Sequence, residues 1–237
     1  DKLFFTYANT VTTIDFAKRY KGHGWVGIRF QTEPEGGYND IILHIRFHQT
    51  ETRAQQETLG KLGVNLIHSA FYKADKPQRI VKYLYDHIEK DLIEIDMINF
   101  SGPKFVGVDN RLMSLQLIKN GMTEAVMFDA DGNNQLPAEQ LYKKNILTLR
   151  GSFRPVTNVN IDMLERSLEL FLKEKGVEKD NTQVIFEITL SNLLASGELD
   201  EQDFMDRARI LCSLGYKVLI SNFKEYYRLA EYFSNYT

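Results

Sequence analysis

The strongest constraint on the fold of this chain is a repeated alternation of short apolar stretches with helical stretches, which begins at Ile41. The seven strand-like stretches are residues 41–48, 64–71, 92–100, 124–129, 146–153, 184–190 and 216–221. Helical periodicity follows each of them, at residues 51–62, 77–89, 110–119, 137–143, 160–175, 200–214 and 224–236. Strands separated by helices pair in parallel through right-handed crossovers. The sequence therefore predicts an α/β fold with a mainly parallel sheet and alternating helices.

Two architectures satisfy this alternation. One is a doubly wound open sheet, and the other is a (β/α)8 barrel whose last unit lies beyond Thr237. The number of units and the abrupt end after a helical segment favour the barrel-like (TIM-barrel-like) fold. Residues 1–40 are expected to form an irregular lead-in and a strand at 23–30, which pairs with 41–48 as a hairpin. We expect residues 1–237 to form a single α/β domain of a longer chain.

Charge and cysteine content restrict the class of partner. The net charge is -3, from 29 basic and 32 acidic side chains, so no general attraction to nucleic acid or to an anionic membrane is expected. No apolar run reaches the roughly 18 residues that a membrane span needs. The lone cysteine, Cys212, excludes an intramolecular disulfide and is typical of a cytoplasmic protein.

Charged side chains interrupt several of the predicted strands, where a buried parallel strand should be almost continuously apolar. They are Glu94, Asp96, Arg150 and Glu187. Because a buried, unpaired charge is costly, each of them must be paired, solvated or functional. One interpretation is a network of structural ion pairs or a strand with one wet face. The other is a polar pocket at the carboxyl ends of the strands.

The pocket interpretation assigns roles to particular residues. The candidate catalytic carboxylates are Asp96, Glu187 and Glu94, which could act as a general base. The candidate substrate-binding residues are Arg150, Ser152, Arg154, His44, Arg46, Asn192 and Asn222. Arg150 and Arg154 suit a phosphate or carboxylate, because a guanidinium binds such anions through two parallel hydrogen bonds. The alternative is that at least one of the two arginines pairs with an internal carboxylate.

The cofactor remains unknown from the sequence. A divalent metal bound by the carboxylates is possible but not favoured. Arg46 places a fixed cation between His44 and His48, which argues against a metal at that strand. The sequence therefore predicts no metal-binding residues.

Four stretches resemble a family of longer, uncharacterised bacterial proteins. They are FSGP at 100–103, VDNRLMSL at 108–115, RGSFRPVT at 150–157 and LISNF at 219–223. The resemblance covers most of the chain from about Gly22 onward and implies that Thr237 is not a natural end. It implies no activity and no catalytic roles.

Two functions remain open, and with them the question of whether the chain is an enzyme. The first is a metabolic enzyme acting on a small anionic substrate, held by Arg150 and Arg154, with Asp96 or Glu187 handling a proton. The second is a non-catalytic binding or assembly module of a larger protein. In the second, the polar strand residues are structural ion pairs, and the aromatic C-terminal helix is a docking surface or simply core.

Overall fold

The computed structural model describes residues 2–13, 22–195 and 197–236, and the chain divides into two compact units, Asp1–Thr123 and Glu124–Thr237. Each unit has its own sheet. Compact units can unfold together or separately, so the single-domain interpretation stays a prediction, which coincident unfolding transitions would test.

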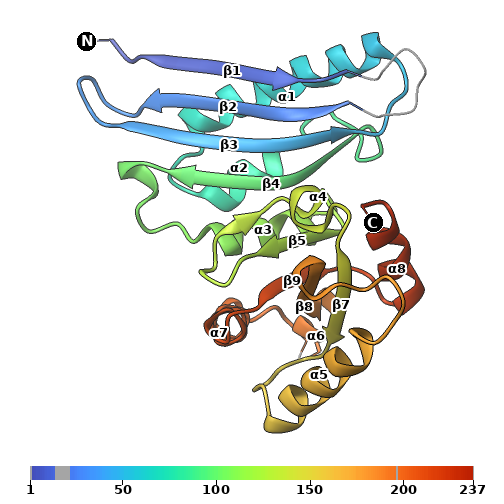
Figure 1. Cartoon of the computed structure of the whole chain (residues 1–237). Coiled ribbons are helices and arrows are strands. Elements are labelled where there is room, and N and C mark those ends of the chain that lie inside the picture. Colours follow the sequence, from blue (N-terminus) through green and yellow to red (C-terminus); the bar gives the residue numbers. More distant parts are fainter. Residues whose placement is uncertain (1, 14–21, 196, 237) are drawn as a thin grey trace. The chain divides into compact units, whose positions relative to one another are not determined.

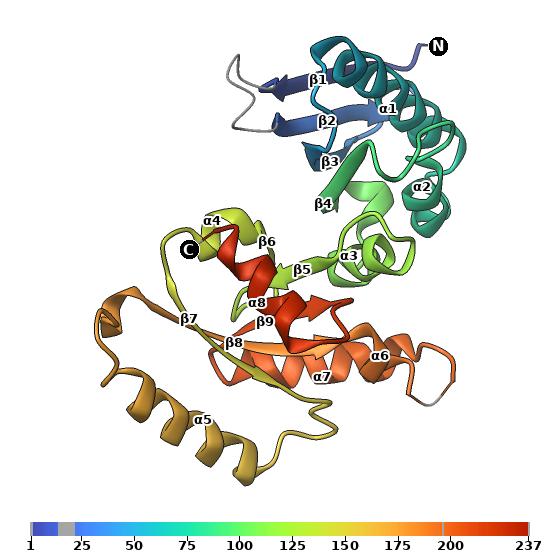
Figure 2. The same cartoon turned by 90° about the vertical axis from the view of Figure 1, so that its right-hand side faces the viewer.

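The first unit is built on a four-stranded antiparallel sheet with the order β1-β2-β3-β4 (Figure 1). Its strands are β1 (Phe5–Val11), β2 (His23–Gln31), β3 (Tyr38–Phe47) and β4 (Ile93–Ser101). Its helices are α1 (Thr52–Tyr72), α2 (Pro77–Tyr83), the 3-10 turn η1 (Pro103–Phe105) and α3 (Asn110–Lys119). Figure 2 shows α1 and α2 on one side of this sheet.

Side-chain alternation gives this sheet one apolar face and one polar face. Ile41, Leu43 and Ile45 of β3 are fully buried on the apolar face, in the same core as Leu62 and Leu66 of α1. The intervening residues of β3 point to the other face, since successive side chains in a strand alternate. That second face carries the polar residues from which the candidate site is built.

The second unit contains a mixed five-stranded sheet with the order β6-β5-β9-β8-β7. Its strands are β5 (Ala125–Phe128), β6 (Asn134–Gln135), β7 (Asn145–Arg150), β8 (Thr182–Thr189) and β9 (Lys217–Ser221). Its helices are α4 (Pro137–Leu141), α5 (Asn158–Phe171), η2 (Lys179–Asn181), α6 (Leu190–Leu193), α7 (Glu201–Ser213) and α8 (Tyr226–Ser234). β7, β8 and β9 run parallel, whereas β5 is antiparallel to both of its neighbours.

The core of the second unit explains the aromatic C-terminal helix. Leu229 of α8 belongs to a buried cluster with Ile185 and Leu219, and Tyr232, Phe233 and Tyr236 pack against that cluster. Tyr226 and Tyr227 are the exposed aromatic residues of this helix. Most of its aromatic surface therefore serves the core of its own unit.

The prediction of a mainly parallel, barrel-like sheet is wrong. The sheets are one antiparallel and one mixed, and neither closes into a barrel. The stretch 64–71, predicted to be a strand, is the second half of α1. Its buried residues, Leu66, Ser69 and Ala70, follow helical spacing, and a short apolar run does not by itself distinguish a strand from a buried helix. Without a strand there, β3 is free to pair antiparallel with β4.

Local features are predicted better than the topology. The hairpin between 23–30 and 41–48 is confirmed, with Trp25 opposite His44 in the register. The helix predicted at 110–119 is confirmed as Asn110–Lys119, and Asp109 caps it by accepting a hydrogen bond from the Arg111 amide at 2.9 Å. In the described part of the chain, no helix is long and apolar enough to cross a membrane.

Candidate functional site

Three side chains of the first unit form a hydrogen-bonded row across its sheet. The carboxylate of Asp96 accepts a hydrogen bond from His44, with 2.6 Å between Oδ1 and Nδ1. His44 Nε2 lies 3.3 Å from Nδ1 of His23. His44 and Asp96 are buried, whereas His23 is exposed. The row therefore runs from a buried carboxylate on β4, through β3, to an exposed imidazole on β2; we call it the His23–His44–Asp96 row.

A bulge in the sheet places the carboxylate within reach. His44 lies opposite Met97 and Ile45 lies opposite Ile95, so Asp96 is an extra residue of β4 without a partner in β3. Bulges of this kind redirect side chains and are common beside functional sites. The ring of Trp25 packs edge-on against His44, with 5.0 Å between ring centroids, and holds the middle imidazole from the β2 side.

The surroundings lower the pKa of His23 below the value of a free histidine. Desolvation by burial contributes most, followed by the electrostatic effects of His44 and then of Arg46. Asp96 acts in the opposite direction and raises this pKa. A lowered pKa keeps His23 neutral near pH 7, which is the state that a general base requires.

Arg46 and Glu94 flank the row. Arg46 lies opposite His23 on one side and opposite Glu94 on the other. The Thr123 hydroxyl donates a hydrogen bond to Glu94, at 2.6 Å. The predicted candidates His44 and Arg46 thus lie on β3, and Glu94 and Asp96 lie on the neighbouring strand β4 of the same sheet.

The remaining predicted candidates lie in the second unit. Arg150 and Glu187 are partners in the register of β7 and β8. The guanidinium donates two parallel hydrogen bonds to the carboxylate, from Nε at 2.6 Å and from Nη2 at 2.8 Å. Ser221 of β9 donates a third to Glu187, at 2.5 Å. Glu187 is completely buried, so this is a paired and hydrogen-bonded charge inside the sheet.

Arg150 is held on its other sides as well. Its Nη1 donates to the carbonyl of Lys224 at 3.2 Å, and its guanidinium carbon lies 4.5 Å from the centre of the Tyr226 ring. The bond to Glu187 raises the pKa of Arg150 above its already high ordinary value. These contacts favour a structural ion pair over an anion-binding role at Arg150.

Arg154 binds a different carboxylate from the one that binds Arg150. It forms an ion pair with Asp203 of α7 at 3.1 Å. Asp203 also binds the buried guanidinium of Arg207, which in turn donates to the Ser152 carbonyl at 3.0 Å. Both arginines proposed for the anion therefore have an internal carboxylate partner.

The two predicted asparagines contribute backbone N–H groups to the segments after β8 and β9. The Asn192 amide donates to the Thr189 hydroxyl at 3.2 Å, which caps α6. The backbone N–H of Asn222 donates to the Glu124 carbonyl at 2.9 Å. These contacts position the chain after β8 and β9 and leave the substrate-binding roles of both residues a prediction.

Sequence reasoning missed His23, Trp25, Asp203 and Arg207. The signal for His23 was present, because pairing 23–30 with 41–48 as a hairpin brings it close to Arg46 and His44. The partner of Arg154 could not be found in this way, since Asp203 lies on a helix remote in sequence. Across the described residues, no group of three or more histidine, cysteine, aspartate or glutamate side chains is placed to hold a metal ion.

Comparison with known proteins gives one partial similarity. No protein-family model matches the chain. No solved structure matches it either. A segment of 119 aligned residues, 48% of this chain, is 29% identical to the human (Homo sapiens) protein "Suppression of tumorigenicity 18 protein". The chain covers 11% of the length of that protein, so the similarity assigns neither a family nor an activity.

Proposed function

We propose that the chain is an enzyme that acts on a small anionic substrate and moves a proton through the His23–His44–Asp96 row. The observation that carries this proposal is the continuous hydrogen bonding from the exposed His23 to the buried Asp96. A carboxylate behind a histidine fixes its tautomer and stabilises its protonated form, which is how a histidine is prepared for proton transfer.

The row can take up a proton at His23 and pass a proton on to His44. With the proton of His44 on Nδ1, facing Asp96, its Nε2 accepts a hydrogen bond from Nδ1 of His23. Nε2 of His23 is then the basic nitrogen that takes a proton from the substrate. Transfer of the Nδ1 proton from His23 to His44 makes His44 an imidazolium beside the Asp96 carboxylate. The positive charge is thereby moved from the surface to a buried position with an adjacent counter-charge.

Arg46 supplies the attraction for an anion in this proposal. It is opposite His23 in the sheet, so a phosphate or carboxylate at Arg46 lies beside the basic nitrogen. This moves the proposed reaction to the first unit, since Arg150 and Glu187 already satisfy each other. We further propose that the chain is cytoplasmic, that it does not bind nucleic acid, and that it is related to longer bacterial proteins.

The test is a thermal-shift screen with phosphate esters, nucleotides and carboxylic acids, each with and without Mg²⁺, Mn²⁺ and Zn²⁺. A ligand present at a hundred times its dissociation constant stabilises the folded chain by about 2.7 kcal/mol. We expect a shift with at least one anionic compound that is lost in Arg46→Gln and kept in Arg29→Gln. Arg29 is a matched control, because it lies on the same sheet, is exposed and pairs with Asp40. Turnover of that compound should be lost in His23→Gln.

The second candidate function is the non-catalytic binding or assembly module. The closed contact between Arg150, Glu187 and Ser221 favours it, because a charge pair with every partner satisfied stabilises a fold without needing a ligand. A screen without any shift, together with full retention of stability in His23→Gln, would favour this candidate over the enzyme.

A further inference from the structure

The strand β1 ends the sheet of the first unit, and its outer edge is a row of backbone hydrogen-bonding groups. Gln31 donates its amide to the Phe4 carbonyl at 3.1 Å, and Thr12 donates to the His23 carbonyl at 2.9 Å. Because these groups alternate along a strand, the even-numbered residues of β1 turn theirs toward β2. The odd-numbered residues Phe5, Tyr7, Asn9 and Val11 turn theirs outward. Among the described residues, no strand pairs with this outer edge.

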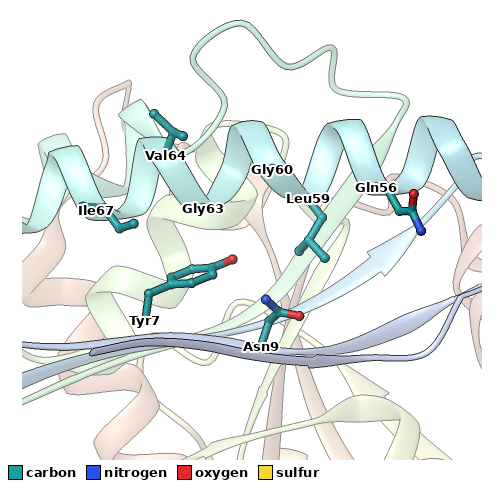
Figure 3. A pocket seen from close by; sticks show the side chains of 8 residues that line it. All are labelled: Tyr7, Asn9, Gln56, Leu59, Gly60, Gly63, Val64 and Ile67. Atoms are coloured by element: carbon teal, nitrogen blue, oxygen red, sulfur yellow. The ribbon is translucent and has the colours of Figure 1, made fainter. Parts of the chain in front are cut away.

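A groove runs beside this edge, between β1 and α1 (Figure 3). Its volume is about 370 Å³. Tyr7 and Asn9 point into it from the strand, and Leu59 and Ile67 reach toward it from the helix. The groove therefore borders the same strand, β1, whose odd-numbered backbone groups face outward.

Two glycines of α1 keep the groove open. A Cβ atom at Gly60 would meet no heavy atom within 4 Å, so packing within the described chain does not require glycine there. A Cβ atom at Gly63 would lie 2.8 Å from the Tyr7 hydroxyl. Glycine in the middle of a helix costs about 0.5–1 kcal/mol relative to alanine. Gly60 thus lowers helix stability and leaves room for a side chain from outside.

The chemistry of the groove defines its occupant. An edge strand is complementary to an extended backbone, which adds to the sheet as a further strand. The lining residues carry no formal charge: Tyr7, Asn9, Gln56, Leu59, Val64 and Ile67, besides the two glycines. A charged side chain would lose its hydration there without gaining an ion pair. The complement of this groove is therefore an uncharged, largely apolar strand.

We propose that β1 and α1 form a binding site for an extended, uncharged peptide segment of a partner protein. The peptide backbone pairs with the outer edge of β1, and every second side chain enters the groove above Gly60. Phe4 and Phe5, which are exposed at the start of β1, extend the apolar contact beyond the groove. This site is separate from the His23–His44–Asp96 row and does not depend on the proposed enzyme activity.

The test begins with a library of random 12-residue peptides displayed on phage and selected on the chain of residues 1–237. The affinity of the selected peptides is then measured by fluorescence anisotropy. We expect uncharged sequences with alternating apolar residues, and at least a tenfold weaker binding to Gly60→Leu, which fills the groove. The matched control is Gly107→Leu, because a Cβ at Gly107 also meets no atom within 4 Å and lies outside the groove. Its affinity should equal that of the unchanged chain.

A backbone variant separates strand addition from simple apolar contact. Asn9→Pro removes an outward amide, and proline is tolerated on an edge strand where that amide faces away from the sheet. We expect it to weaken peptide binding while the melting temperature changes little. The proposal is overturned by peptides that bind Gly60→Leu as tightly as the unchanged chain, or by a library that yields no binder. Concentration-dependent dimerisation that Gly60→Leu abolishes would overturn it in favour of a second copy as the occupant.

Discussion

The clearest energetic consequence of the structure concerns the replacement of Arg150 by methionine. Glu187 is completely buried and accepts two hydrogen bonds from Arg150. In Arg150→Met this carboxylate loses the guanidinium and keeps the hydrogen bond from the Ser221 hydroxyl. Removing one partner of a buried ion pair costs about 3–5 kcal/mol, because the other charge is left uncompensated. For a chain of this length that corresponds to a fall in melting temperature of about 6–20 °C.

The assay is urea unfolding followed by far-ultraviolet circular dichroism, and two further variants make it decisive. Arg154→Met is the matched control: Arg154 is 53% exposed and its partner Asp203 keeps Arg207, so we expect a loss of about 1 kcal/mol or less. Arg150→Met combined with Glu187→Leu removes both charges and should recover most of the stability. A loss below about 1 kcal/mol in Arg150→Met, or a double variant as unstable as the single one, would refute the structural role.

Single contacts elsewhere in the chain have measurable consequences for its stability. Tyr85→Phe should cost about 1–1.5 kcal/mol in urea unfolding, because the buried hydroxyl donates to the Ile93 carbonyl at 2.6 Å. Thr157→Ala should cost about 1 kcal/mol in the same assay, since Thr157 caps α5 through a reciprocal capping box. The pKa of His23 is lowered, so its stabilising contribution is complete above about pH 6.5 and is lost as the pH falls below that value. His23→Gln should therefore reduce the difference between the urea midpoints at pH 7.5 and pH 5. Fluorescence of Trp25 reports on the first unit, and its transition should coincide with that of circular dichroism if the two units unfold as one domain.

The sequence predicts local structure because the signals for it are local. Asp109 followed by an apolar helical pattern identifies α3, and the alternation at 23–30 and 41–48 identifies the hairpin. The topology fails because strand pairing depends on contacts that no local pattern contains. The stretch 64–71 is apolar enough for a strand, yet it continues a helix whose buried residues follow helical spacing.

For the candidate site too, the sequence identifies individual residues but not their partners. Mid-strand charge correctly marks Asp96, Arg150 and Glu187 as residues that need a partner. The identity of each partner depends on register, which places Arg150 beside Glu187. The bulge that brings Asp96 to His44 leaves no trace in the pattern of β4, so the row could not be derived from the sequence.

The central claim is that His23, His44 and Asp96 act as one proton-transfer row. The most direct test is a pH titration of the histidine ring nitrogens by ¹H–¹⁵N nuclear magnetic resonance, in the unchanged chain and in two variants. We predict a pKa of His23 below about 6.5, which rises in Arg46→Gln and falls further in Asp96→Asn. A His23 pKa at or above about 6.5 that neither variant changes would contradict the account.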